Sequence, residues 1–134
     1  MDGIEFLVDG EDVLALIIRA TVMPEKTTFV TPDSFTQQAG FVVYPSGGDI
    51  PAHDHLPIHR ELVGTAETLF VRKGRVEARI YNRQRQLFAT RELSTGDVLM
   101  LVNGGHGFTM LEDTVLFEVK QGPYTGLVEK ERFE

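Results

Sequence analysis

The chain has 134 residues, 42% of them hydrophobic, and a formal net charge of −7. This length predicts one domain with a buried core, and the acidic balance argues against general binding of nucleic acid. Cysteine is absent, which excludes disulfides and thiolate chemistry and suits the cytoplasm. The first residues lack the basic start of a signal peptide, and the longest apolar run, residues 13–18, is too short to span a bilayer.

Short apolar and β-branched runs, punctuated by Gly and Pro, predict an all-β chain. In chain order the expected strands are Ile4–Val8, Val13–Ala20, Phe41–Tyr44, Ile50–His55, Thr68–Arg72, Arg75–Tyr81, Leu87–Leu93, Val98–Val102, Gly107–Leu111 and Val115–Lys120. Such short strands at even spacing are typical of a sandwich or barrel. Helix is expected only as a single turn near Pro32–Phe35, where Asp33 or Ser34 can act as the N-cap.

Two histidines one residue apart, His53 and His55, give the clearest functional signal. Strand residues two apart point to the same face, so the two imidazoles can reach one point in space. Asp54 lies between them and is expected on the opposite face. Imidazole is a common ligand of divalent metals, and the pair therefore predicts a metal site.

Two further residues extend this predicted set. Glu67 begins the strand that follows, and His106 lies in a late Gly-rich turn. Three nitrogens and one oxygen, from His53, His55, Glu67 and His106, suit a divalent ion such as Mn, Fe, Ni or Zn. Such an ion can polarise a carbonyl or activate water.

The spacing of these residues resembles the two motifs of the cupin superfamily. Gly48, His53, His55, Glu67 and Gly74 stand in the order of the first motif, with a gap of eleven residues between His55 and Glu67 where the family has three or four. Gly96, Gly104 and His106 follow the second motif, although Val102 replaces its Pro and its terminal Asn is missing.

The resemblance implies a single-domain cupin-like barrel (double-stranded β-helix or jelly roll) over residues 1–134. Its motif region covers about residues 40–120, with N-terminal strands before it and a tail at residues 121–134. Residues 64–97, 104–108 and 118–124 are more faintly similar to small cupins that are often encoded with surface-polysaccharide genes. This similarity implies no proven activity, and action on a carbohydrate-derived small molecule is the expectation. Related barrels usually pair, and sheet edges need covering, so a homodimer is expected. No nucleic-acid or membrane partner is expected.

Each site residue has an ordinary structural interpretation as well. The His-x-His pair can be two satisfied polar residues at a barrel mouth, and Glu67 can pair with a Lys or Arg. His106 is the weakest match to the family spacing. His59 is expected to be exposed within the insert Leu56–Ala66. The insert either covers the barrel mouth as a lid, reaches a neighbouring subunit, or is a plain surface loop.

The segment from Arg72 to Arg91 carries seven basic residues and one acid, Glu77. The ordinary interpretation is a solvated strand face and hairpin tip. The alternative is a local positive field that attracts an anionic molecule such as a sugar nucleotide.

Three functions follow from these patterns. The first is a metal-dependent enzyme, an isomerase, epimerase or oxygenase, acting on an oxygen-rich small molecule. The second is a metal-free sugar-nucleotide isomerase or epimerase, in which His55 or His106 is the base and Arg79 or a neighbouring basic residue holds phosphates. The third is a sugar or small-ligand sensor without catalysis.

Overall fold

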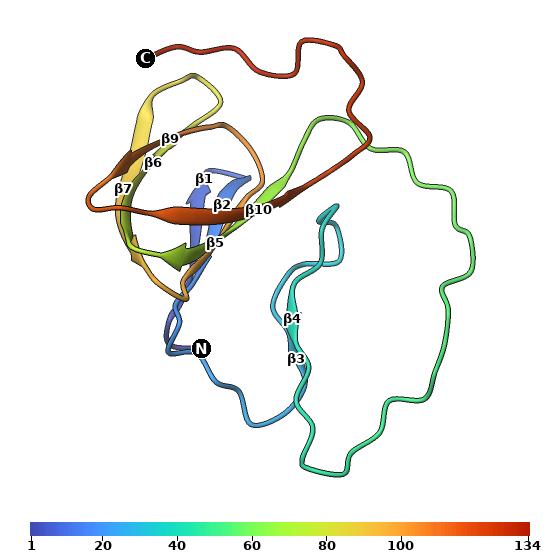
Figure 1. The fold of residues 1–134 in the computed structure, drawn as a ribbon. Helices are drawn as coiled ribbons and strands as arrows, with labels where there is room; N and C mark the ends of the chain where they lie inside the picture. Colours follow the sequence, from blue (N-terminus) through green and yellow to red (C-terminus); the bar gives the residue numbers. More distant parts are fainter. The chain divides into compact units, whose positions relative to one another are not determined.

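The computed structural model describes all 134 residues as ten β-strands without a helix (Figure 1). The strands are β1 (Ile4–Asp9), β2 (Asp12–Ile18), β3 (Thr28–Phe29), β4 (Gly40–Phe41), β5 (Glu67–Lys73), β6 (Arg75–Tyr81), β7 (Leu87–Ser94), β8 (Val98–Leu101), β9 (Gly105–Met110) and β10 (Val115–Lys120). The all-β prediction is confirmed. No helix with the length and hydrophobicity of a membrane span is present.

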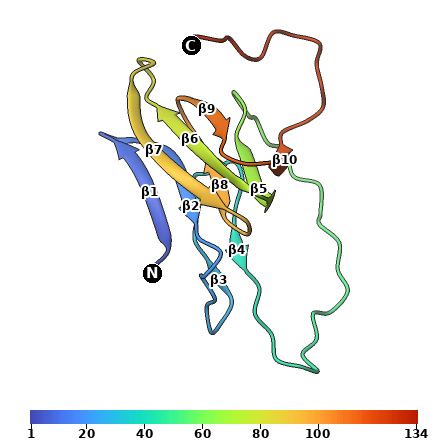
Figure 2. The ribbon, with the colours of Figure 1, turned by 60° about the vertical axis from the view of Figure 1, so that its left-hand side comes forward.

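All strand pairs are antiparallel and form three sheets. Five strands follow the order β1-β2-β8-β5-β10, three follow β7-β6-β9, and β3 pairs with β4. The chain divides into two compact units, Met1–Val22 with Thr65–Glu134, and Met23–Gly64. The five-stranded and three-stranded sheets belong to the first unit (Figure 2), and β3 and β4 belong to the second.

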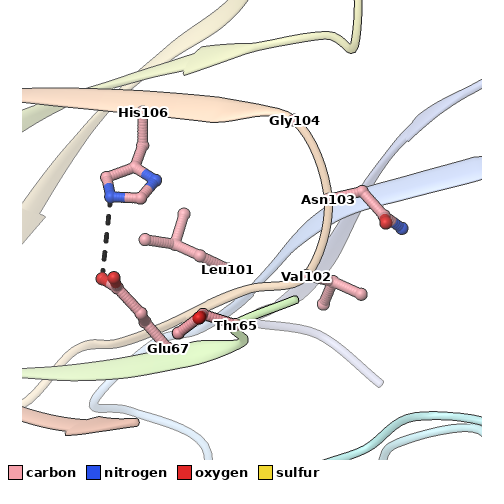
Figure 3. A pocket seen from close by; sticks show the side chains of 7 residues that line it. All are labelled: Thr65, Glu67, Leu101, Val102, Asn103, Gly104 and His106. Carbon is pink, nitrogen blue, oxygen red and sulfur yellow. Dashed lines mark ion pairs between the residues drawn. The ribbon is translucent and has the colours of Figure 1, made fainter. Parts of the chain in front are cut away.

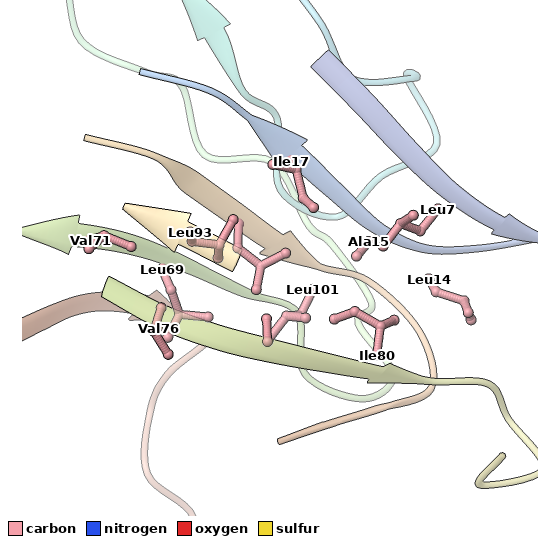
Figure 4. Packing of buried hydrophobic residues seen from close by; sticks show 12 residues of the cluster. Leu7, Leu14, Ala15, Ile17, Leu69, Val71, Val76, Ile80, Leu93 and Leu101 are labelled. Atoms are coloured by element: carbon pink, nitrogen blue, oxygen red, sulfur yellow. The ribbon is translucent and has the colours of Figure 1, made fainter. Parts of the chain in front are cut away.

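One hydrophobic core lies between the two sheets of the first unit (Figure 4). The five-stranded sheet contributes Leu14, Ile17 and Leu99, and β6 contributes Val76 and Ile80; none is more than 1% exposed. The period-two alternation in Arg75–Tyr81 therefore predicts the buried face correctly. Burial of each large aliphatic side chain stabilises the fold by about 1.5–3 kcal/mol.

A single glycine carries the chain from one sheet to the other. β5 lies in the five-stranded sheet and β6 in the three-stranded sheet, although only Gly74 separates them. Gly74 has a φ of +95°, and a Cβ atom there would lie 2.4 Å from the carbonyl oxygen of Asp113. Only glycine fits this crossing, because it has no Cβ and adopts positive φ at little cost.

Eight predicted strands are confirmed, each with ends within two residues of those observed. Arg75–Tyr81 and Val115–Lys120 match at both ends. The expected strand Gly107–Leu111 begins two residues earlier, at Gly105, so that His106 lies within β9. Because His106 lies within the strand, the alternation of β9 determines the face to which its side chain points.

Three predictions for the second unit are wrong in whole or in part. Ile50–His55 forms no strand, because Pro51 has no N–H for a ladder and the segment pairs with no other strand. The strand expected at Phe41–Tyr44 is confined to Gly40–Phe41, which pairs with the unpredicted β3. The expected helical turn is only a turn closed by the Phe35 N–H and the Pro32 carbonyl at 3.1 Å, so Asp33 and Ser34 cap no helix.

Candidate active site

Glu67 and His106 meet in the first unit. Glu67 is the first residue of β5, and His106 is the second of β9. Its Nε2 atom lies 3.6 Å from Oε2 of Glu67 (Figure 3). Side-chain exposure is 19% for Glu67 and 32% for His106. Two of the four predicted site residues therefore face one another.

Strand alternation explains why these side chains turn inward. Glu67 shares a face of β5 with the core residues Leu69 and Val71. His106 lies opposite Ile80, another core residue, in the β6–β9 register. Both polar groups thus occupy positions at the margin of the core.

The pKa of the Glu67 carboxyl is raised to about 7. Burial is the main cause, because it disfavours the charged carboxylate. The carboxyl of Glu118 adds to the rise through a hydrogen bond and like-charge repulsion. Near neutral pH, Glu67 therefore exists in both protonated and ionised forms.

Burial lowers the pKa of His106 below its ordinary value, although the negative charge of Glu118 acts in the opposite direction. The neutral imidazole is consequently the main form at pH 7. A neutral imidazole has one nitrogen free to accept a proton or to bind a metal. The Glu67–His106 pair thus combines a proton donor with a proton acceptor.

A small pocket surrounds the pair (Figure 3). Its lining residues are Thr65, Glu67, Leu101, Val102, Asn103, Gly104 and His106. The volume of about 30 Å³ is room for one or two water-sized groups. A single hydroxyl or carbonyl group of a larger molecule fits this space beside the pair.

Asn103 lines the pocket, and two hydrogen bonds hold its side chain in place. Its side-chain amide donates a hydrogen bond to the carbonyl of Val13 at 2.9 Å and accepts one from Arg83 at 2.6 Å. These bonds direct the amide away from His106 and Glu67 (Figure 3). Asn103 therefore fixes the loop between β8 and β9. Its amide does not face the Glu67–His106 pair.

His53 and His55 belong to the second unit and lie in a segment without strand structure. Both side chains are exposed. Their rings pack edge to face with centroids 5.4 Å apart, and Nδ1 of His53 lies 2.9 Å from the carbonyl oxygen of Pro51. The prediction that a strand aligns these two residues is wrong, whereas their proximity is observed.

The insert Leu56–Ala66 also lacks strand structure. His59 is highly exposed and lies 3.6 Å from the carboxylate of Glu61, in agreement with its expected exposure. At the end of the insert, the backbone N–H of Ala66 donates to the side chain of Gln121 at 2.6 Å. This bond fixes the chain just before Glu67.

A divalent metal fits the donor chemistry of the facing pair, because neutral imidazole and carboxylate are suitable ligands for Mn, Fe, Ni and Zn. No group of three or more His, Asp or Glu side chains is arranged as a metal-binding cluster. The predicted set of His53, His55, Glu67 and His106 therefore stays a prediction.

The basic segment is largely neutralised by ion pairs. Arg75 pairs with Glu92 and Glu112, and Arg91 with Glu5. Further pairs join Arg79 to Glu134, Arg83 to Asp12, and Arg85 to Glu131. These contacts favour the ordinary interpretation of a solvated charged face.

Arg79 lies on the opposite face of β6 from the site. It is opposite Gly107 in the β6–β9 register, whereas His106 is opposite the adjacent Ile80. Since neighbouring strand residues point to opposite faces, Arg79 is directed away from the pocket. It is therefore poorly placed to hold the phosphates of a substrate bound at His106.

Glu118 is a site residue that the motif reasoning missed. In β10 it lies opposite Leu69, on the face that Glu67 also occupies. The alternation of Leu116, Glu118 and Lys120 along Val115–Lys120 is the sequence signal that places it there.

Comparisons with protein-family models, with curated proteins and with solved structures find no match to this chain. The resemblance to cupins therefore rests on the motif residues.

Proposed function

We propose that this chain is a small cupin-like protein whose Glu67–His106 pair transfers protons on an oxygen-rich, carbohydrate-derived molecule. The observation that carries the proposal is the 3.6 Å contact between a carboxyl with a pKa of about 7 and an imidazole that burial keeps neutral. General acids and bases work best when their pKa lies near the operating pH. A closed cupin-type barrel and a cytoplasmic homodimer are part of the same proposal.

In this proton transfer, His106 is the base and Glu67 is the acid. His106 takes the proton from a hydroxyl-bearing carbon next to a carbonyl group, and protonated Glu67 donates its proton to the carbonyl oxygen. The intermediate is an enediol with the same atoms as the substrate. If His106 then gives its proton to the former carbonyl carbon and ionised Glu67 takes the proton of the other enediol hydroxyl, the product is the isomeric carbonyl compound. If water protonates the opposite face of the original carbon, His106 releases its proton to water and Glu67 takes back the proton of the former carbonyl oxygen, the product is an epimer. The pocket volume of about 30 Å³ suits the single carbonyl group that takes part.

Deuterium exchange tests this chemistry. The protein is incubated in D₂O with aldoses, ketoses and nucleoside-diphosphate sugars, and proton NMR follows the loss of carbon-bound hydrogen. Exchange in the wild type should fall roughly 10²–10⁴-fold in Glu67→Gln and His106→Gln. His59→Gln is the matched control, since His59 is exposed and outside the pocket.

Exchange that is unchanged in both pocket variants would sink the proposed roles. Saturable binding of a sugar without exchange in the wild type would favour the sensor function. A chelator should leave the exchange rate unchanged if no metal takes part.

Metal binding is the second candidate function, and the facing of a neutral imidazole and a carboxylate favours it. Glu67 and His106 would hold the ion in the first unit, and His53 and His55 are the further predicted ligands. When bound, a divalent ion supplies Lewis-acid polarisation of a substrate carbonyl.

Elemental analysis by plasma mass spectrometry tests this candidate after loading with Mn, Fe, Ni or Zn. About one metal per chain is expected in the wild type. Loss in both His53→Ala/His55→Ala and Glu67→Gln/His106→Ala supports the four-residue set, whereas loss in only one double variant assigns the ion to that pair. Absence of metal from the loaded wild type contradicts the candidate.

A further inference from the structure

Residues 131–134, the end of the C-terminal tail, contact side chains of β6 and the turn after it and the backbone of β9. The Glu134 carboxylate binds Nε and Nη2 of Arg79 and accepts a hydrogen bond from the Tyr81 hydroxyl. The Phe133 ring meets the ring of Tyr81 edge to face, with centroids 4.9 Å apart. Arg85 stacks on the same phenyl ring at 5.2 Å.

Two glycines make room for these contacts. A Cβ atom at Gly105 would lie 2.7 Å from the Phe133 ring, and one at Gly107 would lie 2.3 Å from Oε1 of Glu134. At these two positions β9 has no side chains, so the tail packs directly against its backbone. These contacts make up a docking site, the tail seat, that consists of Arg79, Tyr81, Arg85, Gly105 and Gly107.

The tail is joined to the rest of the fold by a long exposed connector. β10 ends at Lys120, and residues 122–132 are all exposed and contain no strand. Ten residues, 121–130, separate Lys120 from Glu131, and in extended form they reach about 33 Å. Such a connector lets the tail leave its own seat and reach a neighbouring molecule.

We propose that the tails of two copies of this chain exchange, so that each seat is filled by the tail of its partner. The seat offers two guanidinium groups, and the tail offers the carboxylates of Glu131 and Glu134 around an aromatic ring. The same contacts form within one chain or between two, as in other exchanges of identical elements. A tethered tail has an effective concentration on the order of 1 mM, so exchange grows as the protein becomes concentrated.

Exchange also changes which molecule supplies a charge near the Glu67–His106 pair. Lys130 directly precedes the tail, and its positive charge lowers the pKa of both Glu67 and His106. In the exchanged dimer this lysine comes from the other molecule. The partner therefore supplies a residue that acts on the site.

Complementation between two full-length variants tests the exchange. Arg79→Glu retains a normal tail and loses the seat, and Glu134→Lys retains the seat and loses the tail. Neither can dock its tail internally, but the Arg79→Glu tail fits the Glu134→Lys seat. In sedimentation velocity, the mixture should associate at a concentration about tenfold lower than the wild type needs, because no internal tail competes. Each variant alone should stay monomeric.

Glu129→Lys is the matched control, since it makes the same charge change in an exposed residue outside the seat contacts. It should associate as the wild type does. A mixture that stays monomeric, or association that persists in either single variant, overturns the proposal. Circular dichroism checks folding, and if a charge reversal unfolds the chain, Arg79→Gln with Glu134→Gln repeats the complementation.

Discussion

The carboxylate of Glu67 and the imidazole of His106 come from different sheets and meet with Oε2 3.6 Å from Nε2. The pair lies at the margin of the core and lines the pocket, so the ionisation of either group affects the stability of the fold.

Glu67→Gln should change how stability depends on pH. The folded-state pKa of Glu67 is raised from 4.5 to about 7, so the folded protein binds this proton more tightly than the unfolded chain does. The stabilisation is complete below pH 4.5 and is lost as the pH rises through about 7. The unfolding free energy of the wild type, relative to Glu67→Gln, should fall by about 1–3 kcal/mol across that window. Urea titrations measure the difference, and a constant difference would contradict the shifted pKa.

Glu118→Gln should lower the pKa of Glu67, because it removes the neighbouring negative charge. Burial is the larger cause of the shift, so the pKa should stay above its ordinary value of 4.5. Carbon-13 NMR of the Glu67 carboxyl follows this titration. Glu129→Gln serves as an exposed control in which the Glu67 titration should not move.

Asp97→Ala should destabilise the fold by about 1–3 kcal/mol, because it leaves partly buried backbone N–H donors without their acceptor. The buried Asp97 carboxylate accepts hydrogen bonds from the backbone N–H groups of Ala20 and Ser94, each at 2.8 Å, and pairs with Arg19. Thermal and chemical unfolding measure the loss. The exposed Asp49→Ala should change stability by less than about 0.5 kcal/mol; equal effects would deny Asp97 this role.

Gly74→Ala should cost more stability than Gly10→Ala. Both glycines have positive φ, but a Cβ atom at Gly10 meets nothing within 4 Å, whereas one at Gly74 meets the Asp113 carbonyl at 2.4 Å. Backbone strain alone costs about 1–2 kcal/mol, and the clash adds to it at Gly74. Unfolding measurements on the two variants compare these costs directly, and equal losses would show that the loop at Asp113 moves aside freely.

Local patterns predicted the strands where alternation was strong. The pattern of Arg75–Tyr81 gave both the bounds of β6 and its buried face, because an amphipathic strand records its surroundings in its own residues. The segment Ile50–His55 has an extended pattern too, but it forms no strand because it pairs with no other segment. The sequence of one segment does not show whether a pairing partner exists.

The candidate site was predicted in part. The motif spacing singled out Glu67 and His106, and their side chains lie close together although the residues are 39 positions apart in the chain. It missed Glu118 and the tail seat, because these depend on the registers of β10 with β5 and β9 with β6. Register is set by the packing of whole sheets and leaves little trace in any short motif.

The pairing of β2 with β8 also determines when the protein can fold during synthesis. Ala15 lies opposite Leu101, so the centre of the five-stranded sheet cannot form until β8 has left the ribosome. Until then the β1–β2 hairpin exposes Leu14 and Ile17, which are fully buried in the finished fold. A nascent chain of this kind depends on rapid completion, or on a chaperone, to keep that apolar face from aggregating.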